Sequence, residues 1–210
     1  TADFSMYYRL TDAETSRRWW FFNYAGGFYK VSDEATTKLY LWNETDDDWD
    51  IVTGHGLTTV TGRPIEANGF CYFPCGDSTA MLTFNGTNWD AQTVASGQGC
   101  AYGLALGYSE ADGKAQIWRY NNTLVSGGTI TGLAVSVSRA DIVAAYTTDL
   151  AFRNSVFIGS NSTSITGIST VNNTLWARKT NEVGAVDFDR YTALDYGIKK
   201  NPSSDNGIAF

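Results

Sequence analysis

Histidine and cysteine, the usual ligands of structural metal sites, are scarce in this sequence. It contains one histidine, His55, and three cysteines, Cys71, Cys75 and Cys100. Structural zinc takes a tetrahedral set of thiolate and imidazole ligands in paired spacings, a pattern that these scattered residues do not form. We therefore expect buried thiols and no metal or cofactor, with a bridge from Cys71 or Cys75 to Cys100 left open for an oxidising compartment.

Basic residues and long apolar runs are scarce as well. Fifteen lysines and arginines against 22 acidic residues leave a formal net charge of −7 at pH 7. Nucleic-acid binding needs a basic surface that displaces counterions from phosphates, and no segment approaches the about 20 apolar residues that cross a bilayer. We expect no nucleic-acid partner and no membrane insertion. The missing initial Met and the strand-like end Asn206–Phe210 indicate a piece of a longer chain.

Motifs of the common enzyme classes are also missing. The sequence has no Gly-x-Ser-x-Gly nucleophile turn, no phosphate-binding loop and no dinucleotide fingerprint. The acidic run Asp46–Asp48 lacks the Gly and the distal Glu of a calcium loop, and His55, between two glycines, fits a solvated turn. Ser109–Gly113 only loosely approaches a sialidase Asp box. We predict that the chain is not an enzyme, with a glycoside hydrolase as the third alternative.

The strongest feature that is present is an internal repeat of roughly 40 residues. Ala25–Tyr29 matches Ala67–Cys71 at an offset of 42, and Leu39–Thr45 matches Met81–Thr87 at the same offset. A Trp-Asp pair follows in both copies. The asparagines at positions 43, 85, 121 and 161 continue the spacing. The repeat predicts that Phe28 and Phe70 are equivalent buried residues, as are Leu39 with Met81 and Trp42 with Phe84.

Inside each unit, short runs of alternating apolar residues are separated by turn residues, which is typical of antiparallel strands. The sequence therefore predicts an all-β fold that is β-propeller-like, with repeated four-stranded antiparallel blades in an incomplete ring. The approximate units are 19–52, 63–94, 100–130, 135–170 and 171–210 within a single domain, 1–210. A β-sandwich or jelly roll is the alternative.

Polar and aromatic residues recur at fixed places in the unit. The Asn-x-Ser/Thr patterns fit turns in which Asn bonds its own main chain, with glycosylation as the other interpretation; they begin at Asn43, Asn85, Asn121, Asn161 and Asn172. Tryptophan beside acidic residues can also hold a sugar ring. The weak candidates for ligand binding are Trp49, Asp50, Trp89, Asp90 and Trp118. The alternative is that these tryptophans pack blades together.

The segment Lys38–Asn43 with its acidic turn and Trp49-Asp50, and its partner Leu82–Trp89, resemble the repeats of propeller-bearing structural proteins of tailed bacteriophages, such as tail nozzle, hub and fibre-associated components. The resemblance covers residues 19–130 and rests on an aromatic-Asn-x-Thr-x-Trp pattern that Kelch-like and lectin propellers share. It implies a non-enzymatic virion part whose partners are other structural subunits. The expected location is therefore a virion or the extracellular space, and the competing function is a secreted carbohydrate-binding propeller that attaches to cell-surface glycan.

Overall fold

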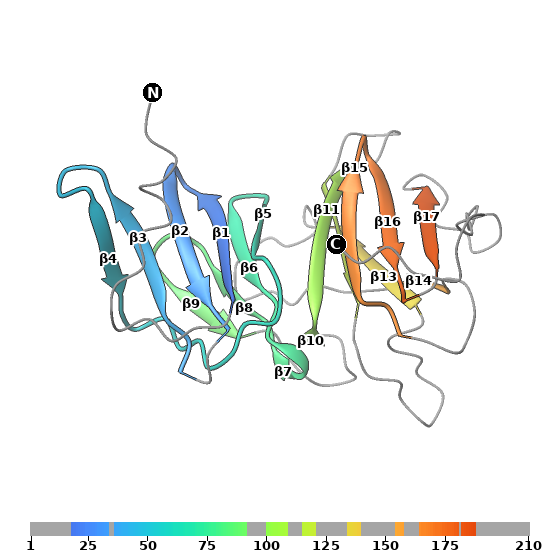
Figure 1. The fold of residues 1–210 in the computed structure, drawn as a ribbon, viewed down its shortest axis with the longest axis horizontal. Coiled ribbons are helices and arrows are strands. Elements are labelled where there is room, and N and C mark those ends of the chain that lie inside the picture. The colour runs from blue at the N-terminus through green and yellow to red at the C-terminus, as the bar shows by residue number, and fades with distance from the viewer. Residues whose placement is uncertain are drawn as a thin grey trace.

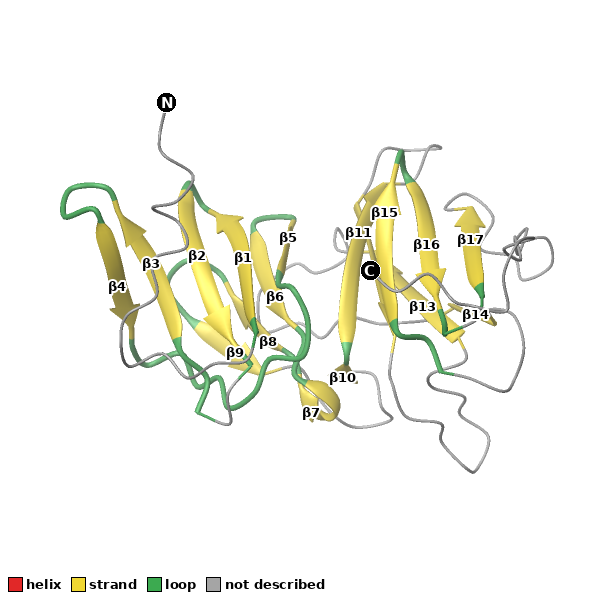
Figure 2. Ribbon diagram, in the orientation of Figure 1, coloured by secondary structure: helices red, strands yellow, loops and turns green. Residues whose placement is uncertain are grey.

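The fold consists of strands joined by turns and loops, with no helix among the residues that the structure describes (Figure 1, Figure 2). A computed structural model describes residues 18–33, 36–91, 100–108, 115–120, 134–139, 154–157, 164–180 and 182–187. No helix in this described part is long and apolar enough to span a membrane.

In the described part of the chain, four antiparallel sheets of three or four strands follow one another, and in each the strands pair in sequence order apart from one short excursion. The first sheet contains β1 (Trp19–Tyr24), β2 (Gly27–Ser32), β3 (Leu39–Asn43) and β4 (Asp48–Val52). The second contains β5 (Ile65–Ala67), β6 (Phe70–Phe73), β8 (Leu82–Phe84) and β9 (Trp89–Ala91). The third contains β11 (Gly103–Tyr108), β12 (Ala115–Tyr120), β13 (Ala134–Arg139) and β14 (Asn154–Phe157), and the fourth β15 (Gly167–Val171), β16 (Thr174–Arg178) and β17 (Val183–Asp187). The excursion is β7 (Gly76–Ala80), which pairs with β10 (Cys100–Ala101).

This arrangement confirms the predicted fold class of repeated four-stranded antiparallel blades. The strand pairing combines strands from two of the units that the sequence predicted as separate blades. The third sheet takes β11 and β12 from the predicted unit 100–130 and β13 and β14 from the predicted unit 135–170. The sequence placed Asn121 and Asn161 in two separate units, 100–130 and 135–170. Both asparagines lie outside the described residues.

The sheets stack face to face, and three apolar clusters lie between neighbours. The first and second sheets share a cluster that includes Phe22, Leu39 and Phe73. Tyr72 and Ile117 belong to the cluster between the second and third sheets. The cluster between the third and fourth sheets holds Trp118, the largest fully buried side chain of the described residues. Its buried members are Ala105, Trp118, Tyr120, Ile165, Leu175 and Ala177.

The first strand of each sheet lies next to the first strand of the following sheet, since β1 contacts β5, β5 contacts β11, and β11 contacts β15. The later strands lie progressively farther out, as Figure 1 shows for β2, β3 and β4. First strands gathered at the centre with the others radiating outward are the arrangement of propeller blades.

Turn geometry sets which residues of two blades correspond. The hairpin turns Ala25-Gly26 and Asn68-Gly69 both have two consecutive residues with positive φ, of 48° and 80° in the first and 53° and 80° in the second. The hairpin β1–β2 is therefore related to β5–β6 by 43 residues, one more than the repeat predicts. Asn172-Asn173 forms the same turn in the fourth sheet, with φ values of 48° and 56°.

The prediction that Phe28 and Phe70 are equivalent is wrong for this reason. Phe28 lies on the face of the first sheet that points away from the second sheet, whereas Phe70 packs toward the third sheet. Sequence identity alone aligned Gly27 with Gly69, whereas the turn geometry aligns Gly26 with Gly69. A shift of one residue moves a side chain to the opposite face of a strand. Leu39 and Met81 are equivalent and buried, as predicted, whereas Trp42 and Phe84 are equivalent in position but only half-buried.

The turn comparison gives a stability prediction. Ala25 is an exposed residue at φ 48°, where an alanine is strained by its Cβ and asparagine is better tolerated. We expect Ala25→Asn to raise the free energy of unfolding by up to about 1 kcal/mol, measured by urea unfolding. Asn68→Ala is the matched reverse change and should lower it by at least as much. An unchanged or lower stability of Ala25→Asn would contradict the assigned turn.

Candidate functional site

One face of the first sheet carries most of the aromatic side chains of that sheet. Direct cross-strand pairs share a face, and the pairing Phe21↔Lys30↔Tyr40↔Ile51 identifies which residues lie together. We call this surface the aromatic face. Its members are Trp19, Phe21, Phe28, Lys30, Tyr40, Trp42, Trp49 and Ile51.

Lys30 lies at the centre of the aromatic face and is only 1% exposed. Its Nζ atom is 4.9 Å from the ring centroid of Trp19, 4.8 Å from that of Tyr40 and 4.7 Å from that of Trp49. The negative faces of aromatic rings attract an ammonium group, and the attraction strengthens when water is excluded. The lysine, on β2, therefore joins its own strand to the three other strands of the sheet through rings on β1, β3 and β4.

The rings around Lys30 also contact one another. Phe21 stacks on Phe28 with centroids 5.9 Å apart, and Trp42 meets Trp49 edge to face at 5.2 Å. Apart from the buried Trp49, the aromatic residues of this face are half-buried, and Ile51 is 62% exposed. None of the residues of this face belongs to the clusters between sheets. A contiguous half-exposed apolar surface of this kind is typical of an interaction site.

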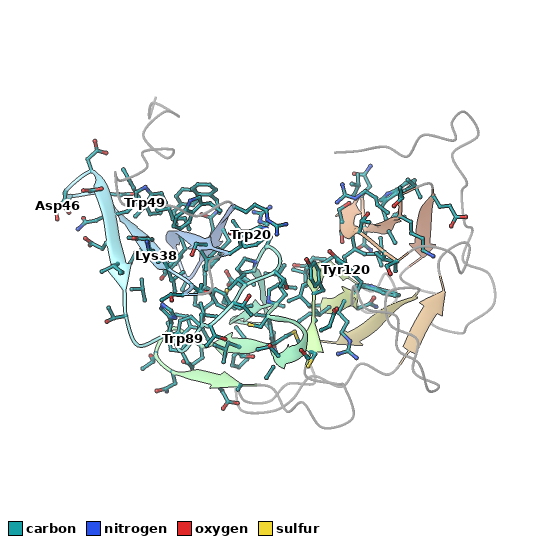
Figure 3. The ribbon with its side chains drawn as sticks, turned by 60° about the horizontal axis from the view of Figure 1, so that its bottom comes forward. Trp20, Lys38, Asp46, Trp49, Trp89 and Tyr120 are labelled. Carbon is teal, nitrogen blue, oxygen red and sulfur yellow. The ribbon has the colours of Figure 1, made fainter. Side chains whose placement is uncertain are left out.

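The corresponding face of the second sheet is covered by the first sheet. Phe73, Phe84 and Trp89 occupy the places that Lys30, Trp42 and Trp49 occupy in the first sheet. They pack against the first sheet: Phe73 meets Phe22 at 5.5 Å, and Phe84 meets Tyr24 at 5.6 Å. Figure 3 shows Trp89 between the sheets and Trp49 on the far side of the first sheet. The aromatic face is thus the counterpart of a surface that another sheet covers.

The fourth sheet is the last one in the described part of the chain, and no described sheet covers its outer side. The inner side of the fourth sheet contributes Leu175 and Ala177 to the cluster between the third and fourth sheets. The alternate residues of its strands therefore point away from the third sheet. We call this outer side the distal face. Its members are Ser169, Val171, Thr174, Trp176 and Arg178, with Val171 54% exposed and Trp176 half-buried.

The structure separates the five candidate ligand-binding residues. Trp118 is fully buried between the third and fourth sheets, and Trp89 lies between Phe73 and Phe84, with its ring stacked on Phe84 at 4.4 Å. Trp49 is 7% exposed. Trp118 and Trp89 therefore pack between sheets, as the packing alternative predicts, whereas Trp49 is buried beneath Phe21, Phe28 and Trp42 of its own sheet and lies outside the clusters between sheets.

The two acidic candidates lie on fourth strands of different sheets. Asp50 is exposed and accepts a hydrogen bond from Asn43 Nδ2 at 2.9 Å, and the same amide donates to Asp46 at 2.9 Å. Asp90 is half-buried on β9, on the strand face opposite to Trp89. Among the described residues no group of three or more His, Cys, Asp or Glu side chains is placed to hold a metal ion.

The predicted chemistry of the asparagine turns is confirmed at Asn43 and Asn85, whereas Asn121 and Asn161 lie outside the described residues. Asn43 Oδ1 accepts hydrogen bonds from the backbone N–H groups of Thr45 and Asp46 at 2.9 and 3.3 Å. Asn85 Oδ1 accepts the same two bonds from Thr87 and Asn88 at 2.9 and 2.7 Å. Each asparagine thus closes the turn between the third and fourth strands of its sheet.

The single histidine and the cysteines have internal contacts. His55, predicted in a solvated turn, is half-buried, and its Nδ1 accepts the Leu57 N–H at 3.0 Å. Burial lowers the pKa of His55, which favours the neutral ring that this bond requires. Cys71, Cys75 and Cys100 are buried free thiols, as expected. Burial raises the pKa of Cys75 to about 11.

Comparison with known proteins adds little to this geometry. No family model matches the sequence, and no curated protein matches it. Among solved structures, a chain in the crystal structure of a nidogen–laminin complex is similar with a TM-score of 0.49, and YCF48 bound to D1 peptide with a TM-score of 0.43. Both are 12% identical over 80% of this chain, which spans 58% and 47% of their lengths.

Proposed function

We propose that the chain is a non-enzymatic, propeller-like module that assembles with other protein subunits, and that it serves as a structural part of a virion of the phage-tail type. The observation that carries the proposal is the aromatic face, because a covered surface of the same design joins the second sheet to the first. The resemblance of the sequence repeats supports the virion setting. The partner that fits best is a β-sheet presented by a neighbouring subunit.

A second copy of this chain offers such a sheet. Each internal contact joins a sheet to the next one along the chain, and the distal face is the side of the fourth sheet on which a following sheet would lie. Ile51 and Val171, two of the three most exposed large apolar side chains of the described residues, lie on the aromatic and distal faces. Docking of these faces would continue the stack head to tail, which generates a ring or a filament.

Sedimentation velocity of the purified chain between about 1 and 100 μM tests the proposal. Copies with a net charge of −7 repel one another, so we expect concentration-dependent association that strengthens as salt screens the repulsion. Ile51→Glu or Val171→Glu should each weaken it at least about tenfold, because a buried unpaired charge is costly. Ser78→Glu adds the same charge at an exposed position of β7 and should have little effect.

A monomer at all concentrations and salt levels would contradict self-association. Equal weakening by Ser78→Glu would show that the contact is not made through the two faces. The virion setting has its own test, which is mass spectrometry of intact particles from the source: the chain should be present in fixed ratio to the other structural proteins, and its absence from particles would overturn this part of the proposal.

A further inference from the structure

The four first strands surround a cavity at the centre of the blades. The cavity has a volume of about 440 Å³ and is lined by β1, by β5 with the preceding Arg63 and Pro64, by β11 and by β15. Cavities that hold small ligands usually measure about 300 to 1,000 Å³. None of the members of the aromatic face lines this cavity; from the first sheet it is lined by Phe22 and by Asn23, the cross-strand partner of Phe28, near the hairpin end of β1.

Five residues with polar side chains line the cavity: Asn23, Arg63, Glu66, Ser169 and Thr170. Asn23, Arg63 and Glu66 are exposed, and none of the five side chains makes a hydrogen bond or ion pair with the described residues. The Thr170 hydroxyl is buried without a hydrogen-bond partner. Buried hydroxyls in folded proteins are normally satisfied, so this group in particular lacks a partner that a bound molecule could supply.

Charges of both signs occur at this cavity. Arg63 presents a guanidinium, whose planar donors match a carboxylate. Glu66 lies three residues later, and its carboxylate can accept hydrogen bonds from an ammonium group. The negative charge of Glu66 also acts on Tyr24. Burial is the largest cause that raises the pKa of Tyr24 to about 12, followed by the charges of Cys71 and Glu66.

The remaining wall is apolar, with Ile65, Leu106 and Ile168 contributing aliphatic side chains. The aromatic lining residue among the described ones is Phe22, which is only 4% exposed. A sugar needs an open ring face on which to stack, and this cavity does not present one. Aliphatic walls between a cationic and an anionic group instead fit a molecule that carries both charges and an apolar side chain.

We infer that the central cavity is a binding site for a small zwitterionic ligand of dipeptide size. Arg63 binds the carboxylate, Glu66 binds the ammonium group, and the aliphatic residues contact the side chain. The Thr170 hydroxyl hydrogen-bonds the amide between the two ends. The site uses one segment from each of four blades, so it exists only when the blades are assembled.

Isothermal titration of the full chain with three probes tests the inference. Glycyl-leucine carries both charges, N-acetylglycyl-leucine lacks the ammonium group, and glycyl-leucinamide lacks the carboxylate. We expect glycyl-leucine to bind with a Kd on the order of 1 mM or lower, and each blocked form to bind at least about tenfold more weakly.

Two variants assign the charges to residues. Arg63→Gln should bind glycyl-leucine and glycyl-leucinamide equally, and Glu66→Gln should bind glycyl-leucine and N-acetylglycyl-leucine equally, because each variant loses one charge contact. Both positions are exposed, so the fold should tolerate the changes. Glu44→Gln, at an exposed turn outside the cavity, should leave all three affinities unchanged. Equal affinity of the wild-type chain for the three probes, no binding of glycyl-leucine, or unaltered selectivity of the two variants would overturn the inference.

Discussion

Trp118→Ala should lower the free energy of unfolding by about 3 to 5 kcal/mol, the usual cost of emptying the place of a large buried aromatic side chain. Trp118 is 0% exposed and packs with Tyr120, Leu175 and Ala177 between the third and fourth sheets. Because domains are stable by only about 5 to 15 kcal/mol in total, the variant should melt many degrees lower. Urea unfolding followed by circular dichroism measures the difference.

Trp176→Ala is the matched control for this prediction. Trp176 is half-buried and lies on the distal face of the adjacent sheet, so its loss empties no closed core site and should cost less than half as much. A Trp118→Ala variant as stable as the wild-type chain would contradict the packing between the third and fourth sheets. It would also restore Trp118 as a candidate for ligand binding.

Lys30→Glu should lower the free energy of unfolding on the order of 3 to 5 kcal/mol, as is typical when a buried charge loses its partner. The variant places a carboxylate against the negative faces of Trp19, Tyr40 and Trp49, where Lys30 Nζ now lies within 4.9 Å of each ring centroid. The new charge would be both desolvated and repelled.

Lys30→Met separates the charge from the packing of the side chain. Methionine keeps an unbranched apolar stem and loses the ammonium group, so it should cost only about 1 to 2 kcal/mol. Lys38→Glu makes the same charge reversal at a half-buried position just before β3 and should cost less than Lys30→Glu. Equal effects of Lys30→Glu and Lys38→Glu in urea unfolding would show that the rings do not hold the lysine.

The sequence predicted the all-β blades and the asparagine turns because both depend on local patterns. Alternation of apolar residues defines strands, and Asn43 and Asn85 bond backbone groups only two and three residues away. The same local reasoning failed for Phe28 and Phe70. Sequence identity favoured one alignment of the hairpins, while positive φ at Ala25-Gly26 and Asn68-Gly69 imposed another.

The candidate sites could not be predicted from the repeat, because they are set by contacts between sheets. Trp49 and Trp89 are equivalent in the repeat, yet one sheet covers Trp89, whereas no described sheet covers the face that carries Trp49. The central cavity was not predicted, because Asn23, Arg63 and Thr170 come from three different units and share no motif. A signal was present only for Lys30, which replaces the aromatic Phe73 of the next unit, but the register error concealed it.

Photo-crosslinking from position 51 tests the central claim, that the aromatic face binds a second copy through its distal face. A p-benzoylphenylalanine in place of Ile51 puts the reactive group at the most exposed apolar position of the aromatic face. A mixture of isotope-labelled and unlabelled chains distinguishes contacts between copies from contacts within one. We predict crosslinks between copies that map to β15 and β16 of the partner copy, around Val171 and Trp176. Crosslinks confined to one chain, or between copies at other strands, would contradict the claim.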